Sequence, residues 1–447
     1  MAADKLWDKG FDVDKTIESF TVGRDRELDL LLAPWDILGS MAHCTMLARQ
    51  GLLSKKECAL LLTELKALYA KAQAGEFRIQ DGVEDVHSQV ELLLTERLGD
   101  LGKKIHTGRS RNDQVLLDIK LFSRAGIERT VGKVQALFKA LLTQSERCKD
   151  ILLPGYTHLQ VAMPSSFGLW FSAWAESLAA DLELLLAAWN VADRNPLGSA
   201  AGYGSSAPLD RSFTTQLLGF AGLDVNSVYA QLSRGKTEWT VATAYASLAA
   251  TLSRFAADCC LFNSQNFGFV SLPREMTTGS SIMPHKKNPD VFELLRAHCN
   301  LIAAIPESIR GITANLPSGY FRDLQLIKEQ YLPLFTQMDA CLDIALFAVE
   351  HMEVKTGLMQ DPRYAAAFSV EEVNRLVAEE GVPFRDAYRR VAEAIEKGTF
   401  HFEGSLHHSH EGSLGNLRLD LIEDRMQKVT ARFRFEPVRA ALNALLA

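Results

Sequence analysis

The sequence predicts an all-α protein built around a central bundle of long helices. Three observations predict this class. Apolar residues between 127 and 142 recur at spacings of three and four, which places them on one face of a helix. Residues 169–192 are apolar nearly all round, which is typical of a helix buried inside a bundle. The alternation of apolar and polar residues that marks strands is scarce along the chain.

Similar long apolar runs at 238–262, 290–315 and 328–354 predict three more bundle helices. Breaks rich in glycine, serine and proline separate the helices, and after "MQDPRY" the helices become shorter and their connections more polar. The sequence therefore predicts three domains. They are an N-terminal helical domain at 1–105, the central bundle domain at 106–360 and a small C-terminal helical domain at 361–447.

Composition narrows the function classes. The net charge of −7 argues against nucleic acid as the main partner, because a nucleic-acid-binding protein needs a basic surface. The most apolar run carries Glu176, Asp181 and Glu183, which are too costly inside a membrane span. Seven cysteines without CxxC pairs favour the reducing cytoplasm, and "MAADKLWDKGFDVDK" lacks the apolar core of a signal peptide.

Two motifs are discounted. "GYGSSA" at 202–207 fits a dinucleotide pattern, but it follows a helix and not a strand. The loop "HFEGSLHHSHEG" contains His407, His408 and His410 without a carboxylate or cysteine at ligand spacing, so a solvated loop is favoured over a metal site. We therefore expect neither a metal nor an organic cofactor.

The loop "HTGRSRND" at 106–113 is a stronger candidate. It could be a solvated loop with a helix cap at Asn112 or Asp113. It also offers a hydroxyl at Ser110, a guanidinium at Arg111 and an amide at Asn112, which together suit a ligand that bears a carboxylate.

Two further loops carry polar groups between long helices. In "GYTHLQ", His158 could bind a ligand or cap a buried helix end. In "SGYFRDLQLIK", Tyr320 precedes Gln325 and Lys328, which share one helical face and could form a binding surface or a polar stripe at the protein surface.

The stretch "GSSIMPHKKNP" at 279–289 joins a flexible turn to a cluster of cations. It could be a mobile solvent loop that needs lysines for solubility. The order of residues favours chemistry, because Ser280 presents a hydroxyl beside successive amides and Lys286 adds charge before a helix that can begin at Asn288. A lysine and a helix N-terminus both stabilise a developing oxyanion.

"GSSIMPHKKNPDVFE" resembles the signature of the fumarase/aspartase superfamily, whose members release fumarate by elimination. Within it, "HTGRSRNDQ", "GYTHLQVAMPSS" and "GVPFRDAY" (381–388) resemble argininosuccinate lyases, and the resemblance runs from about residue 80 to 400. It implies cleavage of argininosuccinate into arginine and fumarate. It also implies a homotetramer whose central bundle forms the core, with each active site assembled from loops of three subunits.

The resemblance assigns roles to residues. It implies that Ser280 is the catalytic serine and that His158, partnered by Glu293, is the catalytic histidine. Ser280 is the candidate base, and the reverse assignment with His158 as base stays open. His87 matches another histidine near the site. The implied substrate-binding residues are Ser110, Arg111, Asn112, Thr157, Lys286, Asn288, Tyr320, Gln325 and Lys328.

Departures from the family pattern leave alternatives open. His285 stands where argininosuccinate lyases usually have glutamine and is more typical of adenylosuccinate lyase. An inactive, crystallin-like structural protein is the alternative from another class. The usual N-terminal serine contact is replaced by "FTVGRDRELD", where Arg24 or Asp25 could substitute. The loop 193–211 and the stretch "SRGKTEW" (233–239) also differ from the sequence that is commonest among argininosuccinate lyases.

Overall fold

The computed structural model describes residues 15–406 and 408–447 and is helical along most of that length. Residues 1–14 and His407 lie outside the described residues. The expectation that the N-terminal segment is not a signal peptide therefore falls mostly outside the described part. Strands within the described part are short and form two-stranded sheets. The predicted all-α class is confirmed.

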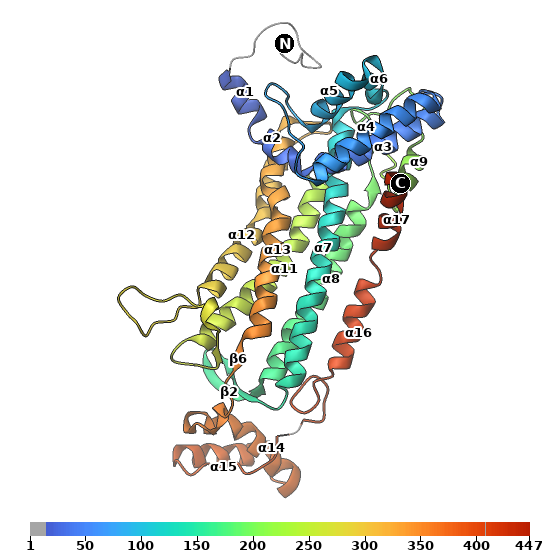
Figure 1. Ribbon diagram of the computed structural model, residues 1–447. Helices are drawn as coiled ribbons and strands as arrows, with labels where there is room; N and C mark the ends of the chain where they lie inside the picture. Colours follow the sequence, from blue (N-terminus) through green and yellow to red (C-terminus); the bar gives the residue numbers. More distant parts are fainter. Residues whose placement is uncertain (1–14, 407) are drawn as a thin grey trace.

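Five long helices run side by side and form the central bundle (Figure 1). Each of them contains or nearly matches a run from which the sequence predicts a helix. Their bounds are α7 (Arg111–Arg147), α8 (Phe167–Ala192), α11 (Lys236–Asn263), α12 (Asp290–Thr313) and α13 (Ile327–His351).

The close approach of α7 to α13 depends on a glycine. A Cβ atom at Gly126 would lie 2.2 Å from Cδ1 of Phe335. The Phe335 ring meets the rings of Tyr245 and Tyr331 edge to face, with centroids 5.0 and 5.3 Å away. Such pairs contribute about 0.5–1.5 kcal/mol each beyond the burial of their area. Tight packing of this kind fixes the helix ends, where the polar loops lie.

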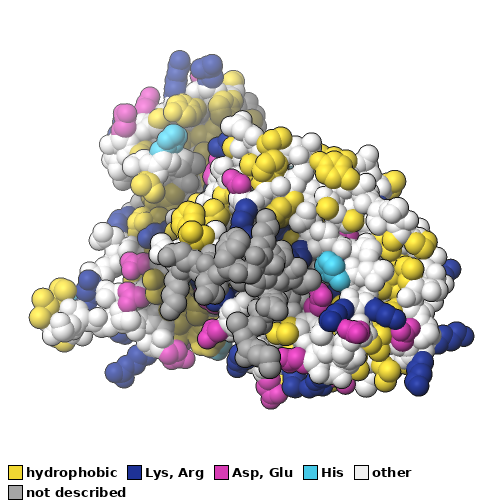
Figure 2. Space-filling view, turned by 90° about the horizontal axis from the view of Figure 1, so that it is seen from above, with side chains coloured by type: hydrophobic (Ala, Val, Ile, Leu, Met, Phe, Trp, Pro, Cys, Tyr) yellow, Lys and Arg dark blue, Asp and Glu magenta, His cyan; other side chains and the backbone are white. Residues whose placement is uncertain are grey.

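A layer of shorter helices covers one end of the bundle (Figure 1) and has its own hydrophobic cluster. Ser54 starts one of these helices with a capping box, since its Oγ accepts from the amide of Glu57 while the Glu57 carboxylate accepts from the amide of Ser54. Figure 2 looks onto this end, where basic and acidic side chains are interspersed. The elements are α1 (Lys15–Val22), α2 (Asp25–Leu28), η1 (Asp29–Leu31), α3 (Ala33–Arg49), α4 (Lys55–Gln73), α5 (Val86–Leu98), α6 (Asp100–Lys103) and η2 (Lys104–His106).

The opposite end of the bundle carries a hairpin and a pair of small helices. The hairpin joins α7 to α8, in the region that the sequence marks only as a break between two helices. The elements at this end are β1 (Leu152–Thr157), β2 (Gln160–Ser166), β5 (Val270–Ser271), β6 (Glu353–Val354), η5 (Leu358–Gln360), η6 (Pro362–Phe368), α14 (Ser369–Glu380) and α15 (Phe384–Glu396).

The last two helices, α16 (Leu419–Thr430) and α17 (Phe435–Leu446), return along the bundle towards the N-terminal layer (Figure 1). Phe435 packs edge-on against the buried Trp189 of α8, with ring centroids 4.8 Å apart. The three-domain division stays a prediction. The remaining short elements are β3 (Arg194–Asn195), α9 (Arg211–Leu217), β4 (Gly222–Leu223), α10 (Ser227–Leu232), η3 (Arg274–Met276) and η4 (Arg322–Leu326).

One described helical stretch, Arg322–His351, is long and apolar enough to cross a membrane, and the bent pair Asp25–Leu31 and Ala33–Arg49 passes the same test only when taken together. Half of the apolar window in Arg322–His351 is buried inside the structure. This stretch includes α13, so its apolar face belongs to the core of the bundle.

Candidate active site

A polar cavity of about 400 Å³ opens where the N-terminal layer meets the starts of α7 and α13. It brings together two loops that lie about 200 positions apart in the sequence. Six of the residues to which the sequence assigns substrate binding line it, namely Ser110, Arg111, Asn112, Tyr320, Gln325 and Lys328.

The first turn of α7 is held rigidly. Ser110, and not Asn112 or Asp113, is the capping residue, because its Oγ accepts from the amide of Asn112 at 3.2 Å. Asp113 completes the capping box by accepting from the Ser110 amide at 2.8 Å. Its second oxygen accepts from the amides of Gly198 and Ala200 at 2.9 and 3.0 Å. The loop around 198–200 therefore fixes the segment that carries Arg111 and Asn112.

Lys328 is buried beneath the cavity and is not part of a surface stripe. Its ammonium donates to Asp29 at 2.7 Å and lies 3.2 Å from Asp25. Burial lowers the pKa of Lys328, but the two carboxylates outweigh burial and raise that pKa above its ordinary value. An ammonium has three N–H donors, so one is left for a ligand. Of the two N-terminal candidates, Asp25 thus supports Lys328, whereas Arg24 pairs with Glu27 at the surface.

Two histidines line the cavity and carry different charges. His87 is 8% exposed, and its Nδ1 lies 2.7 Å from Asp36 and 3.6 Å from Asp118. Burial lowers the pKa of His87, but these carboxylates outweigh it and raise the pKa to about 9. For His106, burial and the cations Arg109 and Arg111 lower the pKa to about 4. At neutral pH the cavity therefore presents an imidazolium at His87 and a neutral ring at His106.

Carboxylates of the protein already pair with two of the guanidinium groups that line the cavity, those of Arg111 and Arg322. Arg111 lies 2.7 Å from Asp85 and 3.3 Å from Glu84, and Arg322 donates to the other oxygen of Glu84 at 2.7 Å. Such pairs orient the guanidinium groups and reduce their net charge. An anionic ligand would share these cations with protein carboxylates.

The loop at 279–289, which carries Ser280, projects from the side of the bundle just before α12 (Figure 1). Its neck is closed by Thr278 and Asn288, whose backbones exchange hydrogen bonds of 3.2 and 2.8 Å. At its turn, the Oγ of Ser280 accepts from the amides of Ile282 and Met283 at 3.3 and 3.2 Å. Two donors directed at one hydroxyl oxygen stabilise negative charge there.

Three more of the predicted site residues lie at the end of this loop and at the start of α12. Lys286 is exposed, and its backbone amide closes a turn by donating to the carbonyl of Met283 at 3.0 Å. The side-chain amide of Asn288 lies 3.4 Å from the hydroxyl of Thr278, at the neck. Glu293 is exposed on the first turn of α12.

Thr157 and His158 lie in the turn of the β1–β2 hairpin, at the far end of the bundle, and not at a helix end. Thr157 pairs with Gln160, and both central residues of the turn are left-handed, with φ of 52° at His158 and 58° at Leu159. This is the backbone of a type I′ turn, which favours glycine or asparagine. Non-glycine residues held in this conformation point to a role for the turn other than stability.

Within one chain, the structure does not bring the three groups of predicted residues together (Figure 1). The cavity lies at the N-terminal layer, whereas the loop at 279–289 and the hairpin turn lie towards the opposite end of the bundle. The sequence reading also missed the buried partners Asp36 and Asp118 and the guanidinium of Arg234, which lines the same cavity. Asp36 and Asp118 are signalled only by a charge among the apolar positions of a helix, whereas Arg234 lies between α10 and α11, in the stretch "SRGKTEW" that already departs from the family pattern.

Metal-ligand geometry occurs at a place that the sequence does not predict. Among the described residues, one group of three has ligand atoms close enough to hold an ion, namely Asp36, His87 and Asp118. His87 donates a hydrogen bond to Asp36, which already compensates part of the negative charge of the two carboxylates. In the histidine-rich loop, Nδ1 of His408 lies 2.7 Å from the hydroxyl of Ser413, which fits a local structural role.

Comparisons with known proteins show the family of the chain. A family model described as a lyase matches residues 2–303. The chain is 60% identical over 444 residues to an argininosuccinate lyase of Bacteroides fragilis, covering 99% of both chains. It is 41% identical over 436 residues to the argininosuccinate lyase of Stenotrophomonas maltophilia, covering 96% of this chain and all of the relative.

Solved structures share the fold. An EDDS lyase variant with bound fumarate has a TM-score of 0.78 at 23% identity, covering 98% of this chain and 95% of its own. A class II fumarase from Schistosoma mansoni has a TM-score of 0.71 at 17% identity, covering 95% and 94%. At these identities the likeness concerns the fold alone.

Proposed function

Since the chain belongs to the argininosuccinate lyase family of the fumarase/aspartase superfamily, we propose that it cleaves argininosuccinate into L-arginine and fumarate in arginine biosynthesis. The observation that carries this proposal is the 60% identity to a protein of that name along nearly the whole chain. This identity disfavours the alternative that the chain is an adenylosuccinate lyase, which His285 had left open. The six residues gathered in the cavity supply the carboxylate- and amide-binding groups that such a substrate requires.

The substrate would be held by its charged ends. The guanidinium of Arg111 and the free N–H donor of Lys328 suit carboxylates, and the amides of Asn112 and Gln325 suit carboxylate or amino groups. Tyr320 adds a phenol at the same wall. We assign these side chains, together with Ser110, to substrate binding.

Ser280 is the proposed base. It takes the proton from the carbon next to a carboxylate of the succinyl part, and the electron pair left behind forms the new double bond as the C–N bond breaks. The two amides that donate to its Oγ lower the cost of a serine alkoxide, and Lys286 and Asn288 on the same loop would stabilise the anionic intermediate.

The leaving nitrogen must be protonated, because a guanidine departs far more readily as a neutral or cationic product. His158 donates this proton, with Glu293 as its carboxylate partner and Thr157 beside it contacting the substrate. The exposed positions of His158 and Glu293 within one chain suit groups that complete the site of a neighbouring subunit.

We infer a homotetramer with shared active sites. Leu294 and Leu301 on α12 are 60% and 67% exposed, and an apolar groove of about 510 Å³ lies between α12 and α13. Apolar surface of this kind on a long helix favours burial against another copy of the chain. The cytoplasm is the proposed compartment, because all seven cysteines are free, including Cys44 and Cys58 with sulfurs 3.6 Å apart.

The test follows fumarate by its ultraviolet absorbance, with argininosuccinate and adenylosuccinate offered separately to the pure protein. Ser280→Ala should lower kcat by about 10²- to 10⁴-fold. Ser281→Ala removes the neighbouring exposed hydroxyl and is the matched control, which should keep nearly the full rate. Turnover of adenylosuccinate alone would refute the substrate, and full activity of Ser280→Ala would remove this serine from its role.

Shared sites have their own test. Ser280→Ala and Asn112→Ala chains should each be inactive alone. Mixed tetramers would contain some sites that combine an intact loop with an intact cavity, so mixing after mild dissociation should restore part of the activity. No recovery in verified mixed tetramers would mean that each chain builds its own site.

A further inference from the structure

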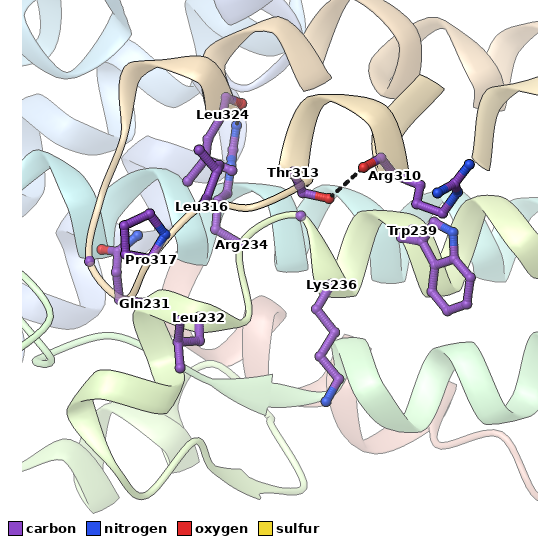
Figure 3. A pocket seen from close by; sticks show the side chains of 12 residues that line it. Gln231, Leu232, Arg234, Lys236, Trp239, Arg310, Thr313, Leu316, Pro317 and Leu324 are labelled. Carbon is purple, nitrogen blue, oxygen red and sulfur yellow. Dashed lines mark hydrogen bonds between the residues drawn. The ribbon is translucent and has the colours of Figure 1, made fainter. Parts of the chain in front are cut away.

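A second cavity, of about 320 Å³, lies where α10 ends, α11 begins and α12 ends (Figure 3). Most residues of the segment 233–239 line it, and this segment is one of the places where the sequence differs from the usual argininosuccinate lyase sequence. Three of its twelve lining residues are cationic and none is acidic. The cations are Arg234, Lys236 and Arg310, of which Arg234 is paired with the buried Glu238 at 3.1 Å and Arg310 with Glu307 at 2.7 Å.

The start of α11 is shaped by a glycine. Gly235 is the N-cap residue with φ of 81°, and a Cβ atom there would lie 2.5 Å from Cγ2 of Thr313. Glycine is thus required, and it offers no side chain to accept from the first amides of the helix. The carboxylate of Glu238 in the first turn accepts from the Gly235 amide at 2.7 Å, so the positive end of the helix is partly compensated where it meets the cations around the cavity.

Two buried polar side chains in the wall have unsatisfied groups. Arg234 is 5% exposed, and it donates through Nη2 to the carbonyl of Leu324 at 2.8 Å. Its Nη1 has no hydrogen-bond partner among the described residues. Gln231 is 2% exposed, and neither atom of its amide has such a partner. Buried polar groups without partners are costly, so these groups indicate a ligand that the wall is built to accept.

The rest of the wall is apolar. The indole of Trp239 is 40% exposed, and Leu316 and Pro317 line the cavity with it (Figure 3). A planar ring favours contact with a flat ligand surface. The charges at the rim and the apolar wall together suit an anion attached to a flat body.

Arg234 connects this cavity with the candidate active site. It lines both cavities, and Leu324, which accepts its hydrogen bond, belongs to η4 together with the proposed substrate contact Gln325. Negative charge bound near Arg234 would reduce the positive potential that the neighbouring cavity offers to an anionic substrate.

We propose that the cavity at the start of α11 is an effector site for a small molecule that carries a phosphate or carboxylate on a flat apolar body. The bound anion is held by Lys236, Arg310 and the N-terminus of α11, and its flat body lies against Trp239. Occupancy weakens the binding of argininosuccinate in the adjoining cavity.

The binding test uses the full-length assembled protein and isothermal titration calorimetry with two probes, adenosine monophosphate and inorganic phosphate. Lys236→Gln/Arg310→Gln should weaken adenosine monophosphate binding by at least about tenfold. Lys149→Gln/Lys397→Gln removes two exposed cations elsewhere and should bind like the wild type. Equal affinity in the wild type and the first double variant, or no binding of adenosine monophosphate or phosphate to the wild type, would overturn the site.

The two probes also test the flat body of the ligand. Adenosine monophosphate should bind more tightly than phosphate, and Trp239→Ala should remove that advantage. Equal affinities for the two probes in the wild type would overturn the assignment of a flat body.

The kinetic test rests on the proposed lyase function. Adenosine monophosphate should raise KM for argininosuccinate by about fivefold, a typical coupling between sites, and this rise should vanish in Lys236→Gln/Arg310→Gln. Binding without a change in KM would overturn the coupling through Arg234. A failure of the lyase function itself would show as no fumarate release without any probe, and it would leave the binding test valid.

Discussion

Replacing His87 by glutamine should remove a large pH dependence of stability. His87 donates from Nδ1 to Asp36, and Asp118 and Asp85 lie close by, so three carboxylates from α3, α7 and the N-cap of α5 surround one buried imidazole. Burial alone would lower the pKa of His87, but these carboxylates raise it to about 9 from an ordinary value of 6.5. Glutamine keeps a hydrogen-bonding side chain but cannot carry the proton.

The magnitude follows from the pKa difference between the folded and unfolded states. One pKa unit corresponds to about 1.36 kcal/mol, so the charged imidazole stabilises the fold by roughly 3 kcal/mol. Because the pKa is raised in the folded state, this contribution is complete below pH 6.5, the ordinary value. It is lost progressively as the pH rises through about 9.

The assay is urea unfolding at a fixed protein concentration, at several pH values between these two limits, because assembly also contributes to stability. The wild type should lose roughly 3 kcal/mol of unfolding free energy across this window, and His87→Gln should lose much less. His401→Gln changes a histidine whose side chain is 77% exposed and should follow the wild type. An equal loss in the wild type and His87→Gln would refute the charged state of His87.

Three further tests address the packing, a buried ion pair and a helix cap. Gly126→Ala should destabilise by about 1–3 kcal/mol because its Cβ meets Phe335, whereas Gly132→Ala on the same helix, with nothing within 4 Å, should stabilise by up to about 1 kcal/mol in urea unfolding. Lys328→Met leaves two buried carboxylates unpaired and should cost about 3–5 kcal/mol by the same measurement, and equal stability would contradict the pairing. Ser54→Ala removes a capping box at the surface and should lower the thermal midpoint by an amount equivalent to about 1 kcal/mol, while an unchanged midpoint would show that the cap is not needed.

The long helices and most of the binding groups could be predicted because their signals are local. The spacing of apolar residues within one helix identifies its buried face wherever the helix lies in the molecule, so the bundle follows from short windows of sequence. The signature around Ser280 likewise carries its turn, its amides and its lysine within eleven residues. The hairpin at 152–166 escaped prediction because its apolar and polar residues do not alternate cleanly and its turn lacks glycine and asparagine.

The sequence by itself determined which segments are helical and which short loops carry hydroxyl, amide and cationic groups. Only the tertiary structure decided which of these groups meet and what charge each one carries. Lys328 is paired with Asp29 across 299 positions, and His87 with Asp36 across 51. The pKa of a side chain depends on burial and on charges within a few ångströms, and residues distant in the sequence supply both.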